Sequence, residues 1–81
     1  MSTYSNYVYR VDSDCVKYAM RKAGYEIGKG GVSQLTRDSC VSRTTLGQIL
    51  KMQIASPGVS VMVQLADTLG VDVHDLLVEN V

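Results

Sequence analysis

A chain of 81 residues with no net charge forms one small domain and has room for only a modest core. No apolar run approaches the roughly 20 residues that a membrane-spanning helix needs, and the amino terminus lacks a signal-peptide pattern. The two cysteines, Cys15 and Cys40, are far apart and form no CxxC motif, which argues against a disulfide framework or a zinc site. We therefore expect a soluble, cytoplasmic protein with no membrane partner.

The charges are unevenly distributed along the chain. All eight Lys and Arg residues precede Pro57, whereas the residues from Pro57 onward carry acids and no Lys or Arg. Such a distribution is compatible with a phosphate-facing half and an acidic half on one domain. Chance clustering of so few charges is the alternative.

Residues 1–12 are predicted to form an arm or strand, and residues 13–79 a helical domain. Tyr7, Tyr9 and Val11 alternate with other side chains, and this period of two predicts an extended segment. A lone strand needs a partner, which could be a second copy or the domain itself; the segment could also be disordered or act as a groove-inserted arm.

A first helix is predicted over 13–23, capped by Asp12 or Ser13 and ended by Gly24. The connector 24–31 contains four glycines, and we expect it to be flexible, with Tyr25 and Ile27 tucked inward. It lacks the GxxxxGK[ST] pattern of a phosphate-binding loop.

Two short helices, over 32–39 and 43–51, are predicted to flank a tight turn. Ser42 is a good N-cap for the second of them, and Val41 and Leu46 are spaced as a hydrophobic staple. A fourth helix is predicted over 57–69, with Ser56 as its cap, Pro57 as its first residue and Gly70 after its end. Asp72 is expected to cap a fifth helix over 73–79.

The helix over 43–51 has two chemically different faces. Leu46, Ile49 and Leu50 form an apolar face, and the opposite face carries Arg43, Thr44, Gly47, Gln48 and Lys51. Side chains of these polar types suit the base edges of a DNA major groove. An ordinary solvated helix face is the alternative.

The chain resembles the lambda-repressor-like (Cro/repressor) family of helix-turn-helix DNA-binding domains over about residues 15–78. The resemblance rests on Leu35-Thr36, Cys40-Val41-Ser42, Leu46, Pro57, the stretch 62–71 with Leu65-Ala66 and Leu69-Gly70-Val71, and Leu76-Leu77. It implies an all-α, five-helix domain with a short extended N-terminal arm. The chain departs from the family pattern at Val32, Thr36, Cys40, Leu50 and Met52, and its connector between the first two helices is longer.

The resemblance implies sequence-specific binding of double-stranded DNA by a small transcriptional regulator, a repressor. Base contacts in the family come from positions that correspond to Arg43, Thr44 and Gln48. Thr45 and Lys51 are better placed for phosphates, and the start of the second helix suits a phosphate as well. The expected DNA-backbone contacts are Lys29, Ser33, Gln34, Arg37, Ser42, Thr45 and Lys51.

One such helix reads only a few base pairs, so we expect a homodimer on a palindromic operator. The apolar tail (Val73, Leu76, Leu77, Val78, Val81) and the Tyr-rich amino end are the candidate contact surfaces. Closure of the monomer core is the alternative role of the tail.

An enzyme is not expected, and neither is a cofactor or a metal. His74 is the only histidine, and no catalytic constellation can be assembled around it. The serious rival is a protein-interaction module or an antitoxin-like partner-binding protein on the same fold, since fold alone does not fix function. The zero net charge favours this rival, and a protein partner could also act alongside DNA.

Overall fold

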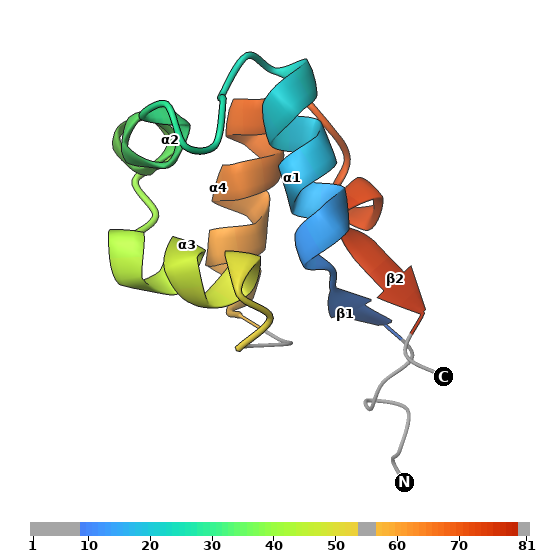
Figure 1. Cartoon of the computed structure of the whole chain (residues 1–81). Coiled ribbons are helices and arrows are strands. Elements are labelled where there is room, and N and C mark those ends of the chain that lie inside the picture. The colour runs from blue at the N-terminus through green and yellow to red at the C-terminus, as the bar shows by residue number, and fades with distance from the viewer. Residues whose placement is uncertain (1–8, 54–56, 80–81) are drawn as a thin grey trace, which may run out of the picture.

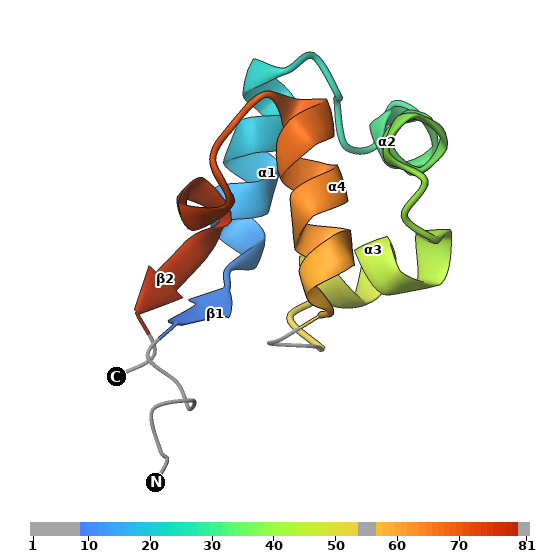
Figure 2. The ribbon, with the colours of Figure 1, turned by 180° about the vertical axis from the view of Figure 1, so that it is seen from behind.

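The computed structural model describes residues 9–53 and 57–79. Its helices are α1 (Ser13–Lys22), α2 (Gly31–Ser39), α3 (Arg43–Leu50) and α4 (Val59–Leu69), followed by the 3₁₀ turn η2 (Val73–Leu76). Two short strands, β1 (Tyr9–Val11) and β2 (Leu77–Glu79), complete the described part. α1 and α4 lie side by side, with α2 and α3 on one flank and the strands on the other (Figures 1 and 2).

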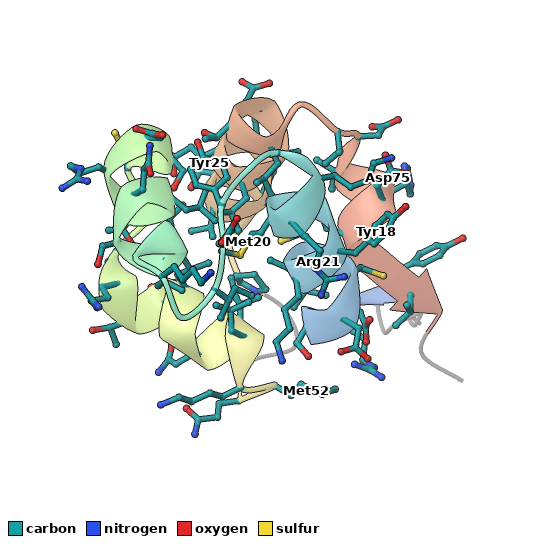
Figure 3. The ribbon with its side chains drawn as sticks, turned by 45° about the horizontal axis from the view of Figure 1, so that its top comes forward. Tyr18, Met20, Arg21, Tyr25, Met52 and Asp75 are labelled. Carbon is teal, nitrogen blue, oxygen red and sulfur yellow. The ribbon has the colours of Figure 1, made fainter. Side chains whose placement is uncertain are left out.

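The core draws on every helix, because each presents an apolar stripe to the centre. Met20 lies at the middle of the domain (Figure 3). The largest fully buried side chains are Val16, Met20, Leu35, Leu46, Ile49, Leu65 and Leu76. Among the described residues, no helix combines the length and apolarity needed to cross a membrane.

The helix ends confirm most of the local predictions. The Asp12 side chain accepts a hydrogen bond from the Cys15 amide (3.1 Å), so Asp12 caps α1. Gly24 and Gly70 adopt the left-handed conformation after α1 and α4. Each ends its helix in a Schellman motif, in which the amides of Tyr25 and Val71 bond back to the carbonyls of Met20 and Ala66.

The predicted fifth helix is wrong, and the fold is therefore not purely helical. Residues 73–76 form one 3₁₀ turn, and residues 77–79 pair antiparallel with β1, Val11 opposite Leu77. The Asp12 amide also donates to the Leu76 carbonyl (3.0 Å). Pairing with β1 provides hydrogen-bond partners for the backbone of residues 77–79. The sequence of these residues alone does not indicate that a partner strand is present. The strand predicted near the amino terminus thus finds its partner within the domain, while residues 1–8 lie outside the described residues.

The fourth helix begins at Val59, with Gly58 as its N-cap and no side-chain capping bond. The prediction that Pro57 is its first residue is therefore wrong. Ser56, which was expected to act as the cap, lies outside the described residues.

The connector between α1 and α2 is closed by hydrogen bonds. The amides of Lys29 and Gly31 both donate to the Glu26 carbonyl (3.1 and 3.0 Å). Tyr25 packs against the core as expected, but Ile27 is 45% exposed, so its predicted inward position is wrong. Only Tyr25 is directed inward, because the turn that begins at Glu26 holds Ile27 outside the core.

Candidate nucleic-acid interface

The turn between α2 and α3 is built by three consecutive residues. The buried Ser39 hydroxyl donates to the Leu35 carbonyl (2.6 Å) and accepts from the Val41 amide (3.3 Å). Cys40 ends α2 in the left-handed conformation, with φ 63°, and its amide bonds to the Thr36 carbonyl (3.0 Å). Val41 is 2% exposed and closes the turn against the core. The chain therefore makes the tight helix-turn-helix link without glycine.

α3 is fixed at both ends and along its inner face. The Ser42 hydroxyl accepts from the Thr45 amide (3.1 Å) and donates to the Thr45 hydroxyl (2.9 Å), so Ser42 is the predicted N-cap. Leu46 and Ile49 are buried. At the other end Met52 is left-handed, and the Gln53 amide bonds to the Gln48 carbonyl (2.8 Å). The outward face of α3 is consequently held in one orientation.

The predicted base-contacting residues lie together on this outward face. Arg43 and Thr44 are exposed, and Gln48 is half-buried. All three border an open hollow of about 650 Å³ between α3 and the segments that face it. The hollow is lined by Lys17, Ile27, Val32, Arg43, Thr44, Gly47, Gln48, Leu50, Lys51 and Gln53.

Arg43 is also linked to α2. Its Nη1 donates to the Ser33 hydroxyl (2.8 Å), so a residue predicted to read bases contacts one predicted to bind the DNA backbone. Both residues sit in the first turns of their helices. This bond restricts the guanidinium, while its other N–H groups keep their donor capacity.

The remaining predicted backbone contacts do not gather at the hollow. Ser33, Gln34 and Arg37 belong to α2, and Ser42 and Thr45 are engaged in the α3 cap. Lys29 lies in the connector, 3.7 Å from Glu26, in an exposed pair that contributes little to stability. Only Lys51 of the predicted backbone contacts borders the hollow.

Lys17 is the functional candidate that sequence reasoning missed. It lies on α1 and borders the hollow together with Lys51 and Gln53. α1 and α3 are far apart in the sequence and contact each other only once the chain has folded. No local signal in the sequence brings Lys17 next to α3.

The electrostatics of the hollow favour an anion. Its lining includes Lys17, Arg43 and Lys51 and no acidic residue. The acid on α2, Asp38, accepts a hydrogen bond from the Tyr25 hydroxyl (2.7 Å), and this bond, with burial, raises the pKa of Tyr25. Asp75, in the acidic carboxyl-terminal part, lies on the side of the domain remote from α3 (Figure 3).

The other reactive side chains form no comparable group. His74 meets the Tyr9 ring edge-on, with 6.0 Å between ring centres. Burial and the neighbouring Asp12 raise the pKa of the Cys15 thiol, which disfavours the thiolate. Within residues 9–53 and 57–79, no three His, Cys, Asp or Glu side chains cluster as metal ligands.

No protein-family model, curated protein or solved structure matches this chain. The resemblance to lambda-repressor-like domains therefore stays a prediction from the residues quoted above.

Proposed function

We propose that this protein binds double-stranded DNA in a sequence-specific manner, as a small transcriptional repressor whose α3 enters the major groove. The observation that carries the proposal is the outward face of α3. It assembles Arg43, Thr44 and Gln48 beside a hollow with three cationic side chains and no acid. Such a face offers both hydrogen-bonding groups for bases and cations for phosphates.

Each residue of the face suits a different part of the duplex. Arg43 can direct two N–H groups to guanine O6 and N7 while Nη1 stays on Ser33. Gln48 can pair with adenine N6 and N7, and the Thr44 methyl group can contact a thymine methyl. Gly47 has no side chain and faces open space, which permits close approach of the helix.

The proposed phosphate contacts come from the rim of the hollow and from neighbouring segments. Lys51 and Lys17 flank the hollow, and Ser33 and Gln34 lie at the amino end of α2, where backbone amides favour anions. The further backbone contacts that we propose are Lys29, Arg37, Ser42 and Thr45. We also propose a homodimer on a palindromic operator and a cytoplasmic location, since the target is genomic DNA.

The proposal is tested by selection of duplexes from a random pool, followed by gel shifts at two salt concentrations. We expect an enriched sequence whose binding weakens as salt rises, because each phosphate contact releases counterions. The alternative function, binding of a protein partner in the manner of an antitoxin, is favoured by the zero net charge. Absence of any shift at low salt would support that alternative.

Two substitutions separate base reading from phosphate binding. Arg43→Ala should weaken binding to the selected duplex by roughly 1–3 kcal/mol and relax the preference at one base pair. Lys51→Ala should weaken binding to all sequences and reduce the salt slope by about one unit.

Lys22→Ala is the matched control for both substitutions. Lys22 lies on α1 beside the Tyr18 ring (5.4 Å) and does not line the hollow, so its removal should leave affinity unchanged. Unaltered affinity of Arg43→Ala for the selected duplex would contradict the orientation of α3.

A further inference from the structure

We propose that the hollow beside α3 receives the C5-methyl group of a pyrimidine, so that the protein selects thymine, or 5-methylcytosine, at the base pair facing Thr44 and Gly47. The inference rests on the proposed DNA-binding function and specifies what this site reads. It starts from an observation that the DNA-binding proposal does not use: the hollow contains apolar side chains among its cations.

The apolar part of the hollow has three contributors from separate segments. Ile27 of the connector is 45% exposed, and Val32 of α2 and Leu50 of α3 are partly buried against the core. Gly47 of α3 lines the same hollow, and even a Cβ atom added there would meet nothing within 4 Å. The surface thus has an apolar recess next to the residues that face the bases.

The Ile27 side of the recess is held in place by the backbone of the connector. The Gly31 amide bonds to the Glu26 carbonyl (3.0 Å), and a Cβ atom on Gly31 would lie only 2.5 Å from that oxygen. Tyr25, two residues before Ile27, is anchored by its hydrogen bond to Asp38. Ile27 is therefore exposed on a braced turn, where it can contact a ligand at little cost in conformational entropy.

The chemistry of the major groove leaves one candidate for an apolar recess. Base edges there present hydrogen-bond donors and acceptors, and their one apolar substituent is the methyl group at C5 of thymine, which 5-methylcytosine shares. The cations Lys17 and Lys51 at the rim suit the phosphates on either side of such a base, while Arg43 suits a neighbouring guanine. A purely apolar ligand would leave these cations without partners.

The test compares the tightest duplex from the random-pool selection with the same duplex in which deoxyuridine replaces every thymine. This exchange removes only the methyl groups. We expect the selected sequence to contain thymine and the deoxyuridine duplex to bind about fourfold more weakly for each methyl group that the recess receives, the equivalent of one buried CH₂ group. Fluorescence anisotropy measures both affinities.

Two serine variants show whether the recess is responsible. Ile27→Ser should lower the ratio of the two affinities toward one, whereas Tyr18→Ser should leave it as in the wild type. Tyr18 is a suitable control because it is also an exposed large side chain (59%), but it lies on α1 and does not line the hollow.

The outcomes separate this inference from the function on which it rests. Equal binding of the two duplexes by the wild type, a selected sequence without thymine, or an unchanged ratio in Ile27→Ser overturns the methyl recess and leaves DNA binding intact. Failure of the pool to yield any enriched duplex overturns the proposed function and the inference together.

Discussion

At the scale of single residues, the two helices of the helix-turn-helix both end on strained backbone. Cys40 follows α2 with φ 63°, and Met52 follows α3 with φ 58°. An L-residue in this region costs roughly 1–2 kcal/mol, because its Cβ atom crowds the next carbonyl oxygen. The absence of glycine at position 40 was visible in the sequence as a departure from the family pattern, and the structure shows that Cys40 adopts the glycine-like conformation.

Cys40→Gly should therefore raise the free energy of unfolding by about 0.5–1 kcal/mol, since relief of the strain exceeds the added entropy of the unfolded chain. Urea denaturation followed by circular dichroism measures the change. Cys40→Ala retains the Cβ atom and removes the thiol, so it should have no comparable effect. An equal increase in the free energy of unfolding in both variants would show that loss of the thiol, and not relief of backbone strain, stabilises the protein.

The Tyr25 side chain makes the free energy of unfolding depend on pH in alkaline solution. Its hydrogen bond to Asp38, together with burial, raises the pKa of Tyr25 above its ordinary value of about 10. A group whose pKa is higher in the folded state stabilises the fold below its unfolded pKa and loses that contribution as pH rises through the folded pKa. The free energy of unfolding should accordingly fall above about pH 10.

Tyr25→Phe should be less stable at neutral pH and should show a smaller decline in alkaline solution. Tyr18→Phe, at a position 59% exposed, should retain the decline. Urea midpoints across this pH range provide the measurement. If the free energy of unfolding of Tyr25→Phe falls at alkaline pH as much as that of the wild type, other titrating groups cause the decline.

At the scale of elements, two glycines contribute to the site in opposite ways. Gly31 starts α2 where the helix touches the Glu26 backbone, and a Cβ atom there would overlap it. Gly47 lies in the middle of α3, where nothing is within reach of a Cβ atom. Gly31 permits close packing of α2 on the connector, whereas Gly47 weakens its helix and leaves the hollow open at that position.

Gly47→Ala should stabilise the protein by roughly 0.8–1 kcal/mol through helix propensity and yet weaken DNA binding, because the new methyl group points into the proposed contact. Gly31→Ala should destabilise it by about 1–3 kcal/mol through overpacking. Thermal melts and duplex titrations of both variants measure the effects. Gly47→Ala with full DNA affinity would contradict close approach of α3.

The predictions from sequence succeeded for elements that are defined locally. Asp12, Ser42, Gly24 and Gly70 act at short range, and the ends that they were predicted to fix agree with the structure within about two residues. Predictions failed where a distant segment decides the conformation. Residues 77–79 form a strand because residues 9–11 lie beside them, and Lys17 reaches the site because α1 packs on α3.

At the scale of the whole molecule, an apolar surface without free charge lies between the strands and α4. Tyr9, Val59 and Val63 are 54%, 80% and 45% exposed, and all line one groove. The charged residue of the groove, Arg10, lies 3.9 Å from Asp12. In a two-fold symmetric contact, a charged residue near the axis lies close to the same residue of the other copy, and the two like charges repel. A surface without free charge therefore suits a homodimer. Of the expected tail surface, Val73 and Leu77 line this groove, whereas Leu76 is buried in the core and Val81 lies outside the described residues.

Val59→Asp should convert the proposed homodimer to a monomer, because the substitution places like charges on both sides of the contact. Sedimentation velocity without DNA measures the change. Since Val59 is largely exposed, the monomeric variant should keep the helical circular dichroism spectrum of the wild type. Tyr18→Asp, at an exposed position on α1, is the control and should stay dimeric. If the wild-type protein sediments only as a monomer, the prediction of a homodimer is wrong.

The antiparallel pair of strands joins segments that lie far apart in the sequence, with Tyr9 opposite Glu79. Helices can form while the chain is still being synthesised, but Tyr9–Val11 cannot pair until residues 77–79 have left the ribosome. Closure of this long loop is thus a late event in biogenesis. A nascent chain halted shortly before residue 77 would contain the residues of α1 to α4 and would still lack the strand that pairs with Tyr9–Val11.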